Sequence, residues 1–249
     1  MVKKGAPVRI RFAELTARAA DWFYPRVCPG CGGLSDRPGR HLCWECRRRI
    51  ELYEDSVCER CGLHVEGRVA HSFVCGACRS DPPRFDRARA AGRFAGVLRE
   101  QIHMFKYGHA LWLTRDLADI LEGCLAAHFT AEDVDVVVPV PLYPARQRDR
   151  SYNQAAVLAR ELACRIGRRC EAAALIRVRH TETQTALDAQ RRRANMSGAF
   201  AVSKPGLVRH RRVLLVDDVM TTGATLNECA RVLKRAEAYK VWAVTLARG

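Results

Sequence analysis

Residues 213–225 constrain the fold more than any other stretch of this chain, because they read as a buried strand, a polar turn and the start of a helix. Residues 213–216 are all apolar, as in a strand buried on both faces of a parallel sheet. Helical spacing of apolar residues resumes at Leu226, Ala230 and Leu233. The stretch therefore predicts an α/β domain whose ligand site lies at the end of this strand.

The turn itself suits a phosphorylated ribose. Its amides, and those of the first helical turn, have no intrahelical partner and lie at the positive end of the helix dipole, where a phosphate binds well. A glycine in the turn permits a positive φ and lets a ligand approach the backbone. Two adjacent carboxylates suit the vicinal hydroxyls of a ribose, because carboxylates accept hydrogen bonds. The candidate ribose- and phosphate-binding residues, of which the two acids are also the catalytic candidates, are Asp217, Asp218, Val219, Met220, Thr221, Thr222, Gly223, Ala224 and Thr225.

Other sites share parts of this pattern. A strand ending in two acids also opens receiver domains, but those need several further strand–helix units, and only residues 219–249 follow here. A Walker loop needs a lysine and a hydroxyl residue after its glycines, and this turn has no lysine. The remaining alternative is an ordinary strand–turn–helix without a ligand.

Eight of the twelve cysteines form four Cys-x-x-Cys pairs. Two thiolates at this spacing hold one ion from a tight turn, and four pairs supply two closed, tetrahedral sites for structural Zn2+. We expect the first four cysteines to form one site and the last four the other, although interleaved pairing or an iron–sulphur centre fits the same spacing. Three nearby histidines, His41, His64 and His71, are expected at the surface. The candidate ligands are Cys28, Cys31, Cys43, Cys46, Cys58, Cys61, Cys75 and Cys78.

The composition and the positions of proline predict three parts of the chain: an N-terminal helical segment (1–26), a double zinc ribbon (27–84) and an α/β domain (85–249). Pro82 and Pro83 lie at the second boundary. Residues 9–24 place apolar side chains on one helical face, which suits packing on the protein or on a membrane surface. Within the α/β domain we expect strands at 85–94, 134–141 and 175–178, and helices at 98–107, 111–125 and 154–166. The polar segment 179–195 is expected to be a lid or a nucleic-acid contact.

The net charge of +15 favours acidic partners such as phosphates, nucleotides or nucleic acid. Residues 85–249 hold 27 of the 42 basic and 17 of the 27 acidic side chains, so the α/β domain carries most of the excess. No apolar run reaches the roughly 18 residues of a membrane span, and no secretory signal is visible. We therefore expect a cytoplasmic protein, where thiols stay reduced and paired cysteines bind metal.

The sequence as a whole resembles the ComF family, whose members join a double zinc ribbon to a type I phosphoribosyltransferase-like domain. The resemblance implies an α/β fold with a parallel sheet, preceded by a small double zinc ribbon, and a role in DNA uptake during natural competence. One departure is Glu237, where relatives commonly carry glycine after the last helix. Beyond the cysteine pairs and the 217–225 loop, the resemblance is carried by 105–108, 138–141, Asn153, Gln154, Thr183, Gln184, Leu187, Arg192, Asn195, 198–200 and 246–248.

Two functions follow from this resemblance. As an enzyme, the protein would transfer phosphoribose from phosphoribosyl pyrophosphate, with Mg2+ neutralising the leaving pyrophosphate. The alternative is a non-catalytic or regulatory protein that uses the same pocket, binds single-stranded DNA and stacks bases on Tyr143 or Tyr152. The implied partners are phosphoribosyl pyrophosphate or a nucleotide, single-stranded DNA and a competence helicase; the sequence does not identify an acceptor. The pyrophosphate or nucleic-acid candidates are Lys106, Arg146, Arg148, Arg150, Arg191 and Arg192.

Overall fold

The computed structural model of the chain describes residues 25–53, 56–67, 69, 71–181 and 194–249. Almost all of the expected N-terminal helical segment and most of the expected lid lie outside the described residues. The same holds for several residues that the sequence singled out, namely Thr183, Gln184, Leu187, Arg191 and Arg192.

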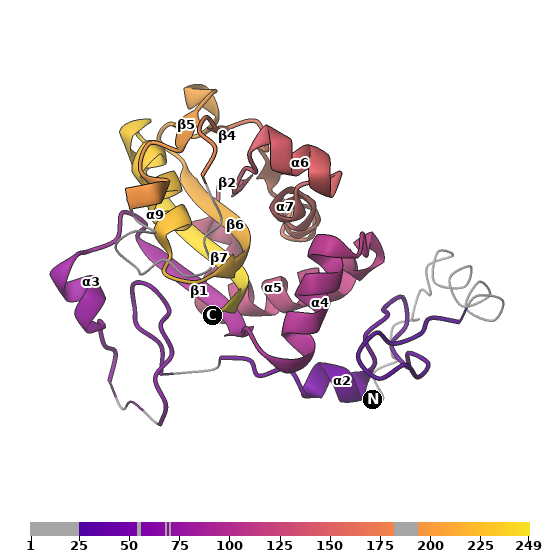
Figure 1. Cartoon of the computed structure of the whole chain (residues 1–249). Helices are drawn as coiled ribbons and strands as arrows, with labels where there is room; N and C mark the ends of the chain where they lie inside the picture. Colours follow the sequence, from indigo (N-terminus) through magenta and orange to yellow (C-terminus); the bar gives the residue numbers. More distant parts are fainter. Residues whose placement is uncertain (1–24, 54–55, 68, 70, 182–193) are drawn as a thin grey trace, which may run out of the picture.

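The domain is built on a five-stranded sheet in the order β1-β7-β6-β2-β3, in which every neighbouring pair is parallel (Figure 1). A separate antiparallel pair, β4 and β5, stands beside it. This arrangement confirms the predicted parallel-sheet α/β class. The strands are β1 (Arg87–Arg93), β2 (Val136–Pro139), β3 (Arg169–Cys170), β4 (Leu175–Arg177), β5 (Phe200–Val202), β6 (Arg212–Met220) and β7 (Lys240–Arg248).

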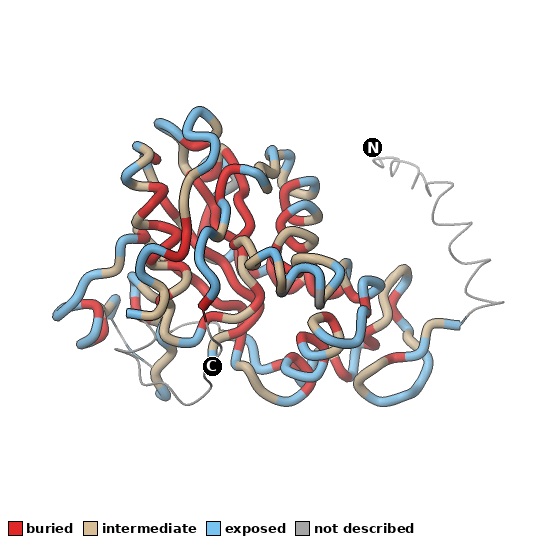
Figure 2. The backbone as a smooth tube through the Cα atoms, turned by 45° about the horizontal axis from the view of Figure 1, so that its top comes forward, coloured by how far each residue is buried: buried red, intermediate tan, exposed pale blue. Residues whose placement is uncertain are grey.

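Helices cover both faces of the sheet, and the sheet between them is almost completely buried (Figures 1 and 2). Along β6 the side chains alternate: Leu214 and Val216 pack with α4, α5 and α7, whereas Leu215 packs with α9. None of the described helices is long and apolar enough to cross a bilayer. The helices are α2 (Trp44–Arg48), α3 (Gly76–Ser80), α4 (Gly96–Tyr107), η1 (Leu111–Leu113), α5 (Thr114–His128), η2 (Ala131–Asp133), α6 (Pro144–Arg150), α7 (Gln154–Arg165), η3 (Pro205–Leu207) and α9 (Ala224–Arg235).

The expected elements are present, with two differences. Strand β6 does not stop at Val216 but continues to Met220, because β7 pairs with it as far as Arg248; the two acids therefore lie inside the strand. The arginine-rich segment after β2 is a short helix, α6, because Pro144 fixes the backbone at its first turn and Ser151 ends it in the left-handed region.

The first zinc ribbon, which contains the cysteines from Cys28 to Cys46, is held against the α/β domain by a buried network of charges. Arg37, only 8% exposed, places its two terminal nitrogens 3.0 Å from Asp116 Oδ1 and 2.8 Å from Asp119 Oδ2. Asp119 also pairs with Arg40 and with Arg165 of α7. Because each buried charge has a partner of opposite sign, removal of one member would leave others uncompensated.

The second zinc ribbon packs on the β1 edge of the sheet. Arg89 of β1 donates to the carbonyl oxygen of Cys58 at 3.3 Å, and Arg248 of β7 donates to that of Cys61 at 2.6 Å. A Cβ on Gly62 would lie 2.7 Å from the backbone oxygen of Ala88, so the ribbon backbone approaches β1 more closely than a side chain allows. The two ribbons lie at opposite sides of the molecule, marked by α2 and α3 in Figure 1.

Glu237 occupies a turn where the backbone favours glycine. Its φ is 63°, in the left-handed region that side chains rarely adopt. Its carboxylate bonds Arg209, with 2.7 Å between Glu237 Oε1 and Arg209 Nη2. The departure from the family pattern therefore affects a surface turn.

Residues 51–53, which join the two ribbons, run antiparallel to the end of β1. A Cβ on Gly92 would lie 2.3 Å from the carbonyl oxygen of Glu51, and this oxygen accepts a hydrogen bond from the Arg93 amide. We expect Gly92→Ala to lower the free energy of unfolding by about 1–3 kcal/mol in urea denaturation. Gly123→Ala is the matched control: with open space and an exposed helical position, it should stabilise by roughly 0.5–1 kcal/mol. Equal effects of the two variants would contradict this reading.

Candidate phosphoribose site and metal centres

Strand β6 extends further than its neighbour β2 at the carboxyl edge of the sheet. The pairing of β2 with β6 ends where Pro139 lies opposite Val216, whereas β6 continues beside β7 to Met220. From Asp217 onward, therefore, β2 no longer covers that side of β6. Ligands of open α/β sheets bind in the crevice outside the carboxyl ends of the strands, and both predicted acids lie there.

Asp218 is paired with Lys106, the next-to-last residue of α4. Lys106 Nζ lies 2.9 Å from Asp218 Oδ1, and the two side chains are only 16% and 12% exposed. Shielding from water strengthens such an attraction relative to a solvated pair. The sequence proposed Lys106 as an anion ligand, and the structure brings it to the acid pair across 112 positions of chain because α4 packs over the end of the sheet.

Asp217 has different neighbours, because adjacent residues of a strand project to opposite sides. Its Oδ1 accepts a hydrogen bond from the Asp218 amide at 2.9 Å. Burial, followed by the negative charge of Asp218, raises the pKa of Asp217 to about 7, against the opposing charges of Lys106 and Arg177. Asp217 is therefore poised to change its charge near neutral pH, as functional carboxylates often are.

Arg177 is a charged neighbour of Asp217 that the sequence did not single out. It lies at the end of β4, donates to the hydroxyl of Thr181 and rests over Phe200, 5.4 Å from the ring centroid. The only sequence signal was its place just before the expected lid. Its approach to Asp217 depends on the β4–β5 pair standing beside the sheet, which no local pattern reveals.

The turn between β6 and α9 keeps the geometry that a phosphate needs. Gly223 adopts φ 77° and immediately precedes α9, and as a glycine it offers no side chain to accept from the first amides of the helix. The Ala224 amide donates to Thr222 Oγ1 over a long 3.4 Å. The positive end of the α9 dipole therefore lies at a turn where Thr222 provides a weak side-chain contact to the first amide. Thr222, Gly223 and Ala224 also line a hollow of about 60 Å³ whose far wall includes Cys61 and Cys78 of the second ribbon.

Of the predicted arginines, Arg150 contacts Tyr107, which follows Lys106 in sequence. Its Nη2 lies 3.2 Å from the Tyr107 hydroxyl and its Cζ 5.0 Å from the Tyr107 ring. Gln154 joins the group, because its amide donates to the Lys106 carbonyl at 3.3 Å. Arg148 is exposed on α6. The side chain of Arg146, like Arg191 and Arg192, lies outside what the structure describes.

The two tyrosines expected to stack bases have other contacts. Tyr152 donates from its hydroxyl to the Phe105 carbonyl and packs edge-on against the Phe105 ring, which is a structural role. Tyr143 meets His180 edge-on, with 5.1 Å between ring centroids.

Among the histidines expected at the surface, His41 and His64 are half-buried against Trp112 and Tyr53, whereas His71 is exposed. Packing of ribbon side chains on aromatic rings explains the difference.

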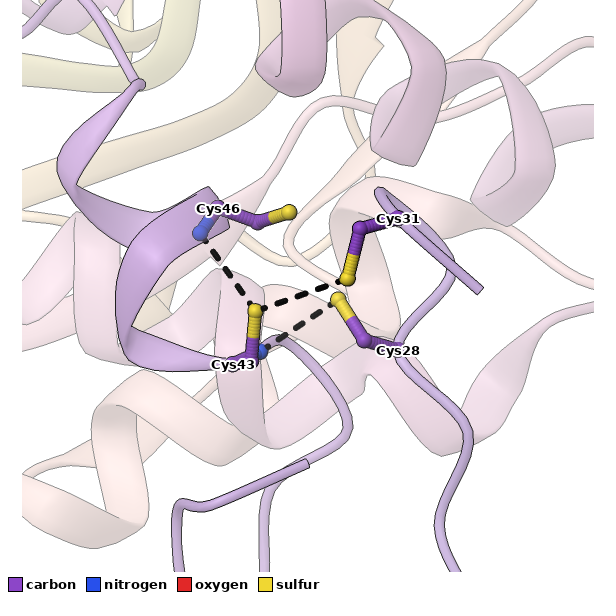
Figure 3. A group of neighbouring side chains, drawn as sticks. All are labelled: Cys28, Cys31, Cys43 and Cys46. Carbon is purple, nitrogen blue, oxygen red and sulfur yellow. Dashed lines mark hydrogen bonds between the residues drawn. The ribbon is translucent and has the colours of Figure 1, made fainter. Parts of the chain in front are cut away.

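The eight paired cysteines form two groups of four, made from the first four and the last four in sequence, as expected. Within each group all four sulfur atoms lie within 4.8 Å of one another. The Cys31–Cys43 and Cys61–Cys75 sulfur distances are both 3.8 Å, which fits the edge of a tetrahedron with Zn–S bonds of about 2.3 Å. Figure 3 shows the first group converging on one point. The chemistry and spacing fit two structural Zn2+ sites.

Backbone amides favour the ionised form of one thiol in each group. The Cys43 amide donates to Cys28 Sγ at 3.4 Å, and the Cys75 amide donates to Cys58 Sγ at 3.3 Å. Burial opposes ionisation, yet these and neighbouring amides lower the pKa of Cys28 and Cys58 to about 7. Burial raises the pKa of Cys46 and Cys78. A cation is therefore needed before all four thiols of a group can ionise together.

The fold and the two cysteine groups define a phosphoribosyltransferase-like domain joined to a double zinc ribbon. Residues 19–79 match the double zinc ribbon domain family, and residues 148–249 match the phosphoribosyl transferase domain family.

Relatives of known name match over most of the chain. Competence protein F of Haemophilus influenzae is 34% identical over 232 residues, covering 90% of this chain and 99% of the relative. DNA utilization protein YhgH of Salmonella typhimurium is 33% identical, covering 81% and 95%. Competence protein ComFC of Bacillus subtilis is 26% identical, covering 85% and 86%. The chain belongs to the ComF family.

Two solved structures align with part of this chain. Glutamine phosphoribosylpyrophosphate amidotransferase from B. subtilis is 22% identical with a TM-score of 0.37, covering 53% of this chain and 26% of that protein. Purine phosphoribosyltransferase from Pyrococcus horikoshii is 18% identical with a TM-score of 0.33, covering 55% and 74%. The match thus spans about a quarter of the amidotransferase.

The cysteine groups predict two Zn2+ ions per chain. We expect Cys46→Ser to reduce zinc content to one ion, measured by elemental analysis, and to lower the melting temperature, because metal binding contributes folding free energy. Cys78→Ser should do the same through the second group. Cys164→Ser is the control, since Cys164 is exposed and outside both groups, and it should retain two ions. Two ions in the Cys46→Ser variant would overturn the assignment.

The raised pKa of Asp217 predicts a pH-dependent stability. A group with a folded pKa of about 7, above its unfolded value, contributes stability that is complete below the unfolded pKa and is lost as the pH rises through about 7. Asp217→Asn removes this loss, so in urea denaturation the variant should gain relative to wild type between pH 4 and 8. Asp135→Asn is the contrast: Arg212 lowers the pKa of Asp135, so this variant should lose stability relative to wild type as the pH rises to about 4 and then keep a constant difference up to pH 8. The same sign for both variants would contradict the prediction.

Proposed function

We propose that this protein binds phosphoribosyl pyrophosphate, or a closely related phosphoribose, in the 217–225 loop. The single observation that supports this most directly is the junction of β6 and α9. There two acids at an open strand edge lead through Gly223, an N-cap residue without a side chain, into the N-terminus of α9. The acids would accept hydrogen bonds from ribose hydroxyls, and the turn amides would hold the 5′-phosphate.

Cations around the acids suit a pyrophosphate group. Lys106 lies against Asp218 and Arg177 lies near Asp217, so positive charge stands on either side of the proposed sugar position. Arg150 extends this charge beside Tyr107. Mg2+ would arrive with the pyrophosphate and neutralise its oxygens. If the protein transfers phosphoribose, positioning and charge stabilisation by these residues would supply most of the rate.

We further propose that the protein works in DNA uptake in the cytoplasm. The names of its relatives, Competence protein F and DNA utilization protein YhgH, support this process. The surplus of basic residues in 85–249 is suited to a nucleic-acid partner. A competence helicase is the protein partner that the process implies.

A second candidate function, single-stranded DNA binding without catalysis, is favoured by one specific contact. Tyr107 is 62% exposed, and the Arg150 guanidinium lies over its ring. An exposed ring beside an arginine is the arrangement on which bases stack in single-strand-binding proteins. In this second function, the 217–225 loop would hold a nucleotide within the DNA strand or at the end of the DNA strand.

A titration separates the two functions. The zinc-loaded protein is titrated calorimetrically with phosphoribosyl pyrophosphate plus Mg2+, and separately with a single-stranded oligonucleotide. We expect Asp218→Asn to weaken phosphoribosyl pyrophosphate binding by roughly tenfold or more, because a charged hydrogen-bond acceptor is worth about 1.5–3 kcal/mol. Asp135→Asn, the same change at the opposite edge of the sheet, should bind like wild type. Tyr107→Ala should weaken only DNA binding.

Two results would count against the proposal. One is the absence of sugar-phosphate binding in the zinc-loaded protein. The other is equal affinity in wild type and Asp218→Asn, which would place the ligand elsewhere. Binding of DNA alone, unaffected by the acids, would leave the second function.

A further inference from the structure

A second cavity lies between the second zinc ribbon and the ends of β1 and β7. Its volume is about 470 Å³, within the roughly 300–1,000 Å³ of pockets that bind small molecules. Its walls come from three segments that are distant in sequence: the linker at 51–53, the ribbon at 63–66, and the sheet edge at Arg93, Phe94, Arg248 and Gly249. Neither the family match nor the phosphoribose site assigns a role to it.

One wall of this cavity is a pair of stacked rings. Tyr53 and His64 lie parallel, with 4.7 Å between centroids and an interplanar angle of 8°. Both are only half-buried, so the pair presents ring surface to the cavity. Phe94 adds a third ring from the sheet edge. Flat aromatic surface at a cavity wall is suited to a planar ligand, and stacking of a base on such a ring is worth about 1–3 kcal/mol.

The polar groups of the cavity come with both signs. Arg93 and Arg248 are donors, and Glu51 and Glu66 are acceptors. Arg93 and Glu51 form only a loose, exposed pair at 3.5 Å, so both remain accessible to a ligand. Because two positive charges face two negative ones, the cavity does not select a strongly anionic group. It suits a neutral ring that carries donors and acceptors at its edge.

The cavity adjoins the sugar-phosphate loop. Gly249, which lines the cavity, donates from its amide to the Met220 carbonyl at 3.1 Å. A Cβ on Gly249 would lie 3.7 Å from Phe94 and 3.8 Å from the Thr221 side chain. Gly249 therefore contacts both the cavity and the first part of the loop.

We propose that this cavity is a nucleobase subsite whose stacking wall is the Tyr53–His64 pair. The proposal rests on the proposed function, since the neighbouring loop would hold the sugar phosphate to which the base is joined, or which a free base would receive. The base of a nucleotide and a free base share the same ring chemistry, and the experiment below distinguishes them. The second zinc ribbon would then serve the ligand directly, by carrying His64.

The test compares ligands that differ only in the ring. The full, zinc-loaded chain is titrated calorimetrically with guanosine 5′-monophosphate, adenosine 5′-monophosphate and ribose 5-phosphate. We expect at least one nucleotide to bind about tenfold or more tightly than ribose 5-phosphate. In Tyr53→Ala this advantage should disappear, while the affinity for ribose 5-phosphate stays unchanged. Tyr53→Phe, which keeps the ring, should retain the advantage.

Two further measurements show whether the ribbon remains folded in the variants and whether a base binds without the 217–225 loop. His64→Ala removes the other ring and should lose the nucleotide advantage with two zinc ions still bound, which shows that the ribbon is intact. Free guanine and adenine are titrated into wild type and Asp218→Asn. Equal binding of a free base to both proteins, lost in Tyr53→Ala, would place the base in the cavity whether or not the loop holds a sugar.

The outcomes separate the two proposals. Absence of ribose 5-phosphate and phosphoribosyl pyrophosphate binding defeats the loop assignment, and the free-base arm then decides the cavity alone. Nucleotide binding that Tyr53→Ala and His64→Ala leave unchanged overturns the base subsite without contradicting the loop assignment. Loss of oligonucleotide binding in Tyr53→Ala, without any effect on nucleotides or bases, would show that the cavity serves nucleic acid and would also overturn it.

Discussion

Thiolates repel one another, and this fold gathers four sulfur atoms at each of two points, all within 4.8 Å. A cation at each point is the condition under which such groups are stable, and it turns weakly apolar segments into rigid ribbons. The ribbons then dock on the α/β domain through arginines: Arg37 holds the first against α5, and Arg89 and Arg248 hold the second against the sheet. Metal binding therefore also stabilises the contacts between each ribbon and the α/β domain.

The second ribbon and the phosphoribose loop meet at the same sheet edge. Strand β6 passes beyond β2 and brings Asp217 and Asp218 to the opening, while β7 ends beside it at Arg248. Arg248 donates to Cys61, and Cys61 with Thr222 lines the hollow behind the loop. The 217–225 loop and the second cysteine group are thus joined by short contacts, so the ribbon supports the side of the sheet on which the proposed phosphoribose site lies.

The sequence predicted the longer helices and the strands β1, β2, β4 and β6, because buried strands and amphipathic helices have clear periods. It did not single out β7, although this strand lies between β1 and β6 in the sheet. Element boundaries were harder to predict where pairing with a neighbouring strand sets them. Strand β6 was expected to end at Val216 because the apolar run stops there, yet pairing with β7 extends it to Met220. No regular element was predicted for the segment after β2, where Pro144 starts a short helix. For the site, the loop and Lys106 were named from motifs, whereas Arg177 was missed because its role depends on how the β4–β5 pair stands beside the sheet.

By itself, the sequence determined the chemistry available: eight thiols in pairs, two adjacent acids, a glycine turn and a surplus of arginine and lysine. Those properties are local, so spacing along the chain reveals them. Tertiary structure decided which distant groups meet, because contacts such as Lys106 with Asp218 and Tyr53 with His64 depend on how helices and ribbons pack against the sheet. It also decided the charge state of Asp217, since burial and the nearness of Asp218 raise its pKa, and neither can be read from the order of residues.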